Sequence, residues 1–376
     1  MGFFNRRNRQ GADDGINHVG GTKRSRHVDS TYSMATRPSF GQWLKVTWLD
    51  ILTFVIMGVI GLGIYEAPPA PTRSFAVTFP SDGEVVYPEF AYPLRKEIIP
   101  IWLAAFLAAV VPILAILIMQ IRIRSFWDVN NGIIGLLYSL IGAAVFQVFI
   151  KFLIGGLRPH FLDVCKPDTS LARNGAGVEG SPYNAAGFNQ LYYTREICTG
   201  DPKEINDSLE SFPSGHSTAA FAGFVYLYLY LNAKLKVFAN YHAAMWKMIV
   251  IYIPILGAVL IAGALTIDEF HNWYDVCAGA IIGSVMAFSS YRMCYAAIWD
   301  WRWNHIPLNR SQACLYTHDG ELMDAMWTRK AGWGVGSPSY NDKHATNGDG
   351  MYSSGAAGPG IPRKAVAGQR RGDDIV

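Results

Sequence analysis

The sequence predicts an all-α integral membrane protein with about six transmembrane helices. Of its 376 residues, 51% are hydrophobic and only 16% are charged, whereas about a quarter of the residues in soluble domains are charged. Apolar runs of about 20 residues, the length of helix that crosses the hydrocarbon core of a bilayer, recur along the chain. The formal net charge of +3 is too small to indicate a nucleic-acid partner.

The first transmembrane helix is expected from about Val46 to Ile64. It has Trp43 before it, as an interfacial aromatic residue, and it must end before Pro68, where closely spaced prolines prevent a helix from continuing. The other transmembrane helices are expected at about 98–121, 132–152, 211–235, 248–265 and 276–297.

Polar tails flank this membrane domain, which we assign to residues 43–300. Residues 1–42 are basic and poor in apolar residues, and residues 301–376 are rich in Gly, Pro, Ser and Asn. Such compositions cannot bury enough apolar surface to fold alone, so both tails are expected to be disordered. The sequence shows no internal repeat.

The basic residues near the helix ends predict the orientation. With about six transmembrane helices, both tails and the basic connections all fall on one side, which is the cytosol by the positive-inside rule. These connections hold Arg122, Arg124, Lys234, Lys236 and Lys247. The loops at about 66–97, 155–213 and 266–274 then face the lumen or the exterior.

The longest outer loop carries two cysteines, Cys165 and Cys198. A non-cytosolic compartment is oxidising, so a disulfide between them is plausible, and two unpaired thiols remain the alternative. The loop also holds the glycosylation sequon Asn206-Asp207-Ser208.

Lys151 and Arg158 form the first of three polar clusters at the ends of apolar runs. Pro159 fixes the backbone beside Arg158, and the planar guanidinium suits two phosphate oxygens. The alternative for Lys151 is a long side chain that reaches for lipid headgroups. His160 follows directly and is a further candidate for holding an anion.

Ser214, Gly215 and His216 form the second cluster, where a polar loop meets the fourth apolar run. A helix that starts here exposes free backbone N–H groups and a partial positive charge, which suit an anion such as phosphate. His216 is placed to donate a proton near neutral pH. The alternative is a simple helix cap beside a polar residue.

His271 and Asp275 form the third cluster. Their spacing of four residues puts them on one face at the start of a helix. A carboxylate that holds one ring nitrogen of a histidine makes the other nitrogen a better nucleophile or base. One alternative is a structural hydrogen bond. The other is a metal site of His216, His271 and Asp275, but no ligand spacing here specifically favours a metal.

Together these clusters read Lys-x6-Arg-Pro, Pro-Ser-Gly-His and His-x3-Asp, in that order across about six helices. In this the chain resembles the type 2 phosphatidic acid phosphatase (PAP2) family of lipid phosphate phosphatases, in particular its fungal branch, over about residues 45 to 298. The resemblance implies a PAP2-like helical bundle in the bilayer, a lipid phosphate as substrate, and neither metal nor cofactor.

The resemblance also implies roles for individual residues. Lys151, Arg158, Ser214 and Gly215 match positions that hold the phosphate. His271 matches the nucleophile that forms a phosphohistidine, Asp275 the carboxylate that orients it, and His216 the acid that protonates the leaving alcohol. By the predicted topology these residues meet at the non-cytosolic face.

One position departs from the family pattern. The third motif of the family is Ser-Arg-x5-His-x3-Asp, and this chain has Ala264 and Leu265 in place of Ser and Arg. Losing one preorganised donor costs about 100- to 1000-fold in turnover. We predict an active lipid phosphate phosphatase. A non-catalytic relative that binds lipid phosphates or partners is the second reading, and a transporter on the same scaffold is the third.

Overall fold

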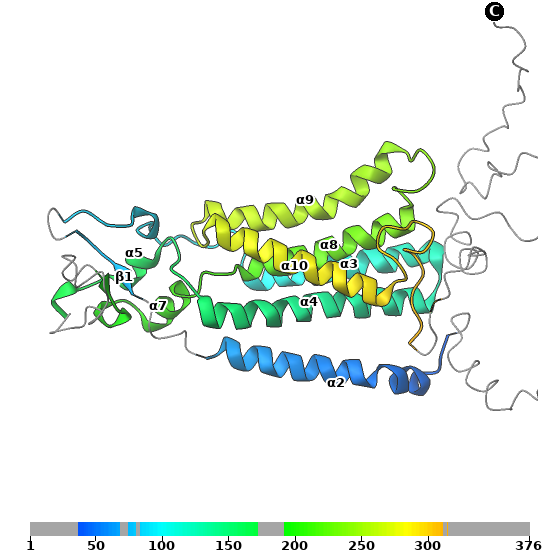
Figure 1. The fold of residues 1–376 in the computed structure, drawn as a ribbon, viewed down its shortest axis with the longest axis horizontal. Helices are drawn as coiled ribbons and strands as arrows, with labels where there is room; N and C mark the ends of the chain where they lie inside the picture. The colour runs from blue at the N-terminus through cyan, green and yellow to red at the C-terminus, as the bar shows by residue number, and fades with distance from the viewer. Residues whose placement is uncertain (1–36, 68–73, 80–82, 172–191, 311–313, 315–376) are drawn as a thin grey trace, which may run out of the picture.

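The computed structural model describes residues 37–67, 74–79, 83–171, 192–310 and 314. It confirms the predicted all-α fold. Six long helices run side by side along the longest axis of the molecule (Figure 1). They are α2 (Phe40–Tyr65), α3 (Ile101–Ile123), α4 (Phe126–Ile154), α8 (Gly215–Leu235), α9 (Met245–Ile267) and α10 (Trp273–Cys294).

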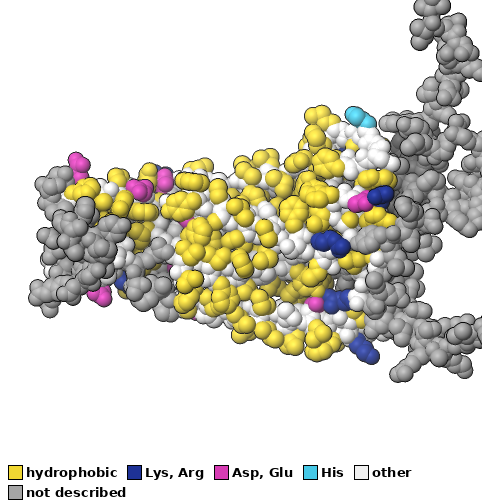
Figure 2. All heavy atoms as spheres, viewed as in Figure 1, with side chains coloured by type: hydrophobic (Ala, Val, Ile, Leu, Met, Phe, Trp, Pro, Cys, Tyr) yellow, Lys and Arg dark blue, Asp and Glu magenta, His cyan; other side chains and the backbone are white. Residues whose placement is uncertain are grey.

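Five of the described helices, α2, α3, α4, α9 and α10, are long and apolar enough to cross a membrane. Hydrophobic side chains cover the flank of the bundle (Figure 2), and the exposed ones include Val59, Trp102 and Leu153. Exposed apolar side chains around hydrogen-bonded helices suit the water-free interior of a bilayer. The chain is a multi-pass membrane protein.

Helix α8, predicted as the fourth transmembrane helix, lies inside the bundle. It packs against α3, α4, α9 and α10, and none of its residues, all of which are described, is exposed. Its residues are buried except for Gly215, Ala219 and Phe221, which are partly exposed, so it can carry polar residues such as Asn232 and Lys234 away from lipid. The predicted count of about six helices is met by α8 and the five apolar helices, of which α3, α4, α9 and α10 pack against it.

Helix α2 begins at Phe40, earlier than the predicted Val46. Ser39 caps it: its Oγ accepts the N–H of Gln42 at 3.4 Å, and the Gln42 side chain accepts the N–H of Ser39 at 3.0 Å. This reciprocal capping box satisfies two backbone donors at the helix start. Residues 40–42, predicted to belong to the tail, are therefore helical, and residues 1–36 lie outside the described residues.

Short elements form a small layer beyond one end of the bundle (Figure 1). They are β1 (Phe75–Ala76), η1 (Pro88–Phe90), α5 (Phe161–Cys165), η2 (Thr169–Leu171), β2 (Tyr192–Tyr193), η3 (Arg195–Ile197) and α7 (Pro202–Ser208), with β1 and β2 paired antiparallel. Their apolar side chains, Phe75, Phe161 and Ile197 among them, make a second, smaller core.

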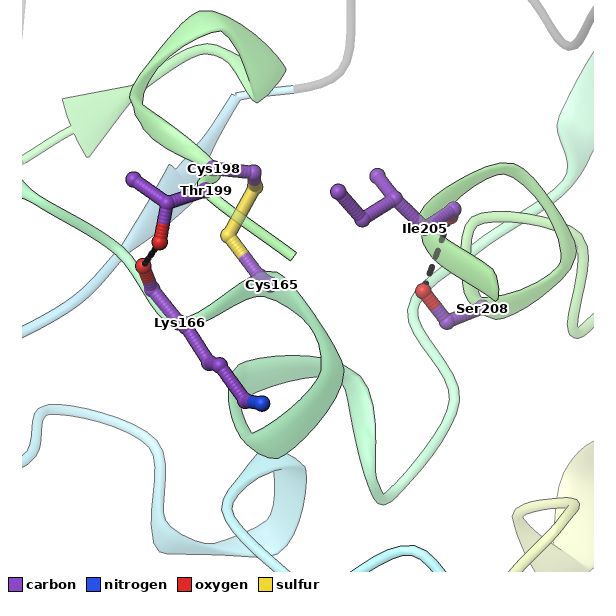
Figure 3. Close-up of a disulfide and its surroundings, with 6 residues drawn as sticks. All are labelled: Cys165, Lys166, Cys198, Thr199, Ile205 and Ser208. Atoms are coloured by element: carbon purple, nitrogen blue, oxygen red, sulfur yellow. Dashed lines mark hydrogen bonds between the residues drawn. A yellow bond between two sulfur atoms is a disulfide. The ribbon is translucent and has the colours of Figure 1, made fainter. Parts of the chain in front are cut away.

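Cys165 and Cys198 form a disulfide within this layer (Figure 3). The bond joins the end of α5 to the residue that follows η3. Beside it, the Thr199 hydroxyl donates to the carbonyl oxygen of Lys166 at 2.7 Å. The structure thus favours the paired reading of these two cysteines.

Asp128 is the centre of a buried polar cluster toward the opposite end of the bundle, where α4 begins. Its carboxylate is fully buried and forms an ion pair with Lys234. It also accepts hydrogen bonds from Gln120 Nε2 at 2.8 Å and from the Tyr230 and Tyr295 hydroxyls at 2.7 and 3.2 Å. These contacts tie α3, α4 and α8 to the end of α10.

The ordered chain continues past the predicted tail boundary at residue 301. His305 and Ile306 are buried, Lys234 donates to the His305 carbonyl at 3.0 Å, and Leu308 N–H donates to the Cys294 carbonyl at 2.9 Å. Residues 301–310 pack because their backbone groups find partners at the ends of α8 and α10. Residues 311–313 and 315–376 lie outside the described residues.

Candidate active site

The three polar clusters converge where α4 ends and α8 and α10 begin, beside the small outer layer. Backbone hydrogen bonds hold these segments together. Phe212 N–H donates to the Gly155 carbonyl at 3.0 Å, Gly156 N–H to the Leu209 carbonyl at 2.9 Å, and Ser214 N–H to the Asp275 carbonyl at 3.1 Å. Residues far apart in sequence thereby share one site.

Helices α8 and α10 touch closely at this point because Gly279 has no side chain. A Cβ atom at Gly279 would lie 2.6 Å from the carbonyl oxygen of Ser214, which is well inside van der Waals contact. The need for a glycine at this position could not be predicted from the sequence, because the neighbouring helix imposes it. The close approach fixes the start of α8 against the helix that follows His271.

His271 and Asp275 lie together, both almost fully buried. Nδ1 of His271 is 3.6 Å from Oδ2 of Asp275, which is longer than a hydrogen bond. Ser211 contacts both residues: its hydroxyl donates to Asp275 Oδ2 at 2.5 Å and its Oγ is 3.5 Å from His271 Nδ1. The carboxylate also accepts the N–H of Asn272 at 3.0 Å, which caps α10.

Ser211 was part of the stretch that predicts the start of α8, but its contact with Asp275 was not predicted. Only the spacing of residues within one segment is visible in a sequence, and these two residues come from different segments. No local signal distinguishes Ser211 from other serines in the loop.

Burial lowers the pKa of His271 to about 4, and the neighbouring Asp275 opposes this shift by favouring the charged ring. Positive charge on Arg158 and Lys151 also lowers the pKa. The imidazole is therefore neutral near pH 7, with a lone pair on one ring nitrogen. A neutral histidine beside a carboxylate is the form required of a nucleophile or a base.

His216 faces His271 across the site, with ring centroids 6.3 Å apart and ring planes at 70°. The ring is almost fully buried, and its Nε2 has no hydrogen-bond partner among the described residues. A buried polar atom without a partner is costly, so this nitrogen is available to a ligand. The site can therefore present two histidines to one bound group.

The start of α8 lies beside His216. Ser214 caps the helix by accepting the N–H of Ser217 at 3.4 Å, and the carbonyl of Pro213 accepts a hydrogen bond from Gln147 Nε2 at 3.1 Å. The first-turn N–H groups keep their partial positive charge. This arrangement suits the binding of an anion.

Lys151 and Arg158, the two cations among the predicted phosphate ligands, both have acidic partners. Lys151 Nζ is 3.7 Å from Glu210 Oε2, and Arg158 Nη2 is 2.7 Å from Asp207 Oδ1. The Arg158 guanidinium also lies 5.5 Å from the centroid of the Phe270 ring, a cation–π distance. The two cations were predicted from the sequence, but neither of the two carboxylates was.

Leu265 lies at the end of α9 and is fully buried. Its carbonyl oxygen accepts the N–H groups of Phe270 and His271, each at 3.2 Å. The backbone at this position thus shapes the turn that presents His271, while its side chain adds only packing. His160 lies against the same turn: its Nδ1 is 3.0 Å from the Glu269 carbonyl oxygen.

Two cavities of about 530 Å³ each lie beside the site. One is lined by Ser211 and Asp275 together with apolar residues including Phe90, Ile154 and Tyr274. The other is lined by residues including Arg95, His160, Asp207 and Phe270. Among the described residues, no three His, Cys, Asp or Glu side chains are grouped as metal ligands.

Comparison with known proteins identifies relatives of the chain. Residues 132–299, which hold all three clusters, match the model of the PAP2 superfamily. A PA-phosphatase related-family protein of Dictyostelium discoideum is 34% identical over 69% of this chain and 67% of its own length.

Two further relatives have more specific names. Lipid phosphate phosphatase 2 of Arabidopsis thaliana is 31% identical over 67% of this chain and 78% of its own length. Diacylglycerol pyrophosphate phosphatase 1 of Saccharomyces cerevisiae is 31% identical over 67% and 80%. No solved structure matches the chain.

Proposed function

Since the chain belongs to the PAP2 superfamily, we propose that it hydrolyses phosphomonoesters of membrane lipids, such as phosphatidate, through a phosphohistidine. The observation that carries this proposal is the meeting of His271, Asp275 and His216 at one end of the bundle, with ring centroids of the two histidines 6.3 Å apart.

In the first step, the neutral Nε2 of His271 attacks phosphorus and the bond from phosphorus to the lipid oxygen breaks. His216 takes up a proton from solvent when the phosphate dianion binds beside it, and it donates this proton to the leaving oxygen, which departs as an alcohol. Asp275 and Ser211 hold the other side of the His271 ring and stabilise the positive charge that forms on it.

In the second step, water attacks the phosphohistidine and His216 takes the proton that the water loses. The bond from phosphorus to Nε2 breaks, and phosphate and neutral His271 are released. Each histidine returns to its starting state, so the cycle needs no other reactant.

Lys151, Arg158 and the N–H groups at the start of α8 neutralise the charge on the phosphate oxygens during both steps. Phosphoryl transfer depends mainly on such positioning and charge stabilisation. The proposal assigns this work to protein groups alone and includes no metal ion or cofactor.

We place the reaction at the non-cytosolic face. The site lies at the end of the bundle that carries the Cys165–Cys198 disulfide and the sequon Asn206-Asp207-Ser208. The basic residues Lys234 and Lys236 lie at the opposite end of α8. An oxidising compartment on the site side and cytosol on the basic side agree with both features.

The test is phosphate release from phosphatidate and from diacylglycerol pyrophosphate by the full-length protein in detergent with a chelator present. Release is expected from the wild type, with a loss of activity in His271→Ala. His242→Ala, a change of an exposed histidine in the connection between α8 and α9, is the matched control. No release from either lipid by the wild type, or full activity of His271→Ala, would overturn the proposal.

A second candidate follows from Leu265. Leu265 replaces the arginine of the family's third motif, and a site that lacks this cation could bind lipid phosphates without hydrolysing them. In that case the wild type would bind phosphatidate vesicles, His271→Ala would bind them equally well, and neither would release phosphate.

A further inference from the structure

Both cations of the proposed phosphate site are already occupied by carboxylates from one short segment. Asp207, near the end of α7, pairs with Arg158, and Glu210, just after α7, pairs with Lys151. The segment leads directly into the start of α8. With two positive and two negative side chains, the ligand-free site is close to neutral, so an arriving phosphate meets little net attraction.

The two carboxylates differ in their access to water. The Asp207 side chain is 54% exposed, whereas that of Glu210 is 18% exposed and its partner Lys151 is 13% exposed. Asp207 can turn into solvent as an anion at small cost. Glu210 cannot, because an unpaired buried carboxylate is expensive and takes up a proton instead.

The surroundings of Glu210 agree with this difference. The charged and titratable groups that face it are Lys151 of α4, Arg158, Asp207 of α7 and Tyr65 of α2. Burial raises the pKa of Glu210, and Lys151 opposes this shift. A phosphate bound to Lys151 would remove that opposition and add negative charge, which favours the protonated carboxyl further.

We propose that Asp207 and Glu210 are internal counter-ions that compete with phosphate for Arg158 and Lys151. On binding, phosphate displaces Asp207 into solvent, while Glu210 stays in place, takes the proton of a phosphate monoanion and donates a hydrogen bond back to a phosphate oxygen. Glu210 thereby supplies a donor to a site in which Leu265 supplies none. This inference rests on the proposed function for the position of the phosphate.

The experiment measures binding of inorganic phosphate to the full-length protein in detergent, by calorimetry, in parallel with lipid phosphate release. Near neutral pH, Asp207→Asn and Glu210→Gln should each bind phosphate about 1.5- to fivefold more tightly than the wild type, the range expected when a partly exposed ion pair is removed. Glu196→Gln removes the same charge from an exposed residue of η3 and should leave the affinity unchanged.

Glu210→Ala tests the donor separately. The amide of Glu210→Gln keeps a donor and the methyl of Glu210→Ala does not, so Glu210→Ala should bind phosphate several-fold more weakly than Glu210→Gln. Each variant must elute as a single species with an unfolding midpoint near that of the wild type. If both Glu210 variants fail to fold, the phosphate affinity of Asp207→Asn compared with that of the wild type still tests the counter-ion role.

The outcomes separate this inference from the proposed function. Equal affinities in Asp207→Asn, Glu210→Gln and Glu196→Gln would overturn the counter-ion role, and equal affinities in Glu210→Gln and Glu210→Ala would overturn the donor role. If phosphate binds more tightly to Asp207→Asn but no variant or wild type releases phosphate from lipid, the counter-ion role stands and the enzymatic proposal falls.

Discussion

The hydroxyl of Ser211 donates a hydrogen bond of 2.5 Å to the carboxylate of Asp275. The same oxygen lies 3.5 Å from Nδ1 of His271. Ser211, from the segment before α8, thus contacts both residues of the His271/Asp275 pair at the start of α10. The orientation of His271 therefore depends on a third side chain as well as on Asp275.

Ser211→Ala should reduce kcat while KM changes little. Without the hydroxyl, Asp275 and His271 lose a group that contacts both and holds their positions. Misplacing a reacting group by about 1 Å lowers the reaction rate about 100-fold. Steady-state kinetics on phosphatidate measure this effect. Ser211→Thr, which keeps the hydroxyl, should recover part of kcat, and Ser289→Ala, on the exposed face of α10, should have no effect. A rise in KM alone would assign Ser211 to substrate binding.

Leu265→Arg should raise kcat/KM, by up to about 100-fold, if the site is a family site that lacks one cation. Leu265 is fully buried at the end of α9, so the new guanidinium is stable only if it reaches the phosphate. Leu265→Met keeps the volume without the charge and is the control. Lower or unchanged activity of Leu265→Arg, with the fold intact, would mean that the site neutralises phosphate in another way.

The stability of the protein should depend on the protonation of His271. Its pKa in the folded state, about 4, lies below the ordinary value of 6.5, so protons bind more strongly to the unfolded chain. The contribution of the neutral ring is complete above about pH 6.5 and is lost as the pH falls toward 4.

Thermal unfolding at a series of pH values checks this prediction. The difference in midpoint between the wild type and His271→Gln should shift against the wild type as the pH falls from about 6.5 to 4. Carboxylates that lie away from His271 and titrate in the same range affect both proteins equally and cancel in the comparison. A difference that stays constant with pH would contradict the neutral, buried state of His271.

Asp128→Ala should destabilise the bundle by about 3–5 kcal/mol, since it leaves the buried ammonium of Lys234 without its counter-ion. Chemical unfolding in detergent measures the loss. Asp300→Ala breaks an exposed ion pair with Arg302 and should have a small effect. The double variant Asp128→Ala/Lys234→Met should recover stability relative to the single one. No recovery would mean that the hydrogen bonds of Asp128, not its charge, stabilise this end of the bundle.

Reduction of the Cys165–Cys198 disulfide should lower the unfolding midpoint of the wild type and leave that of Cys165→Ser/Cys198→Ser unchanged. A cross-link of this kind stabilises a protein by about 2–4 kcal/mol. Mass spectrometry after alkylation of protein isolated without reductant also tests the topology. Two free thiols at these positions would contradict an oxidising environment on the site side of the membrane.

The long helices followed from the sequence because lipid-facing helices need apolar runs of a definite length. Helices α3, α9 and α10 follow the predicted ranges closely, whereas α4 begins at Phe126, ahead of the predicted Gly132. The start of α2 was missed because a capping box at Ser39, not hydropathy, sets it. Residues 301–310 look like a polar tail in sequence, but their partners, such as Lys234, lie far away in the chain.

The candidate site could be predicted where its chemistry depends on residues that are close together in the sequence. His271 and Asp275 are four residues apart on one helix face, and His216 lies at a helix start. Ser211, Asp207 and Glu210 could not be predicted, because each acts through a partner from another segment. Only the folded chain brings Glu210 to Lys151 and Asp207 to Arg158.

The burial of α8 among other helices has a consequence for how the membrane acts on the protein. Changes in acyl-chain length or headgroup composition act directly on α2, α3, α4, α9 and α10, which have exposed apolar surfaces, and reach α8 mainly through α3, α4, α9 and α10, which pack against it. The lipid therefore exerts little direct mechanical effect on His216 and the start of α8. The phosphate of the proposed substrate is part of a membrane lipid, while the helix that binds it does not respond directly to changes in bilayer thickness or composition.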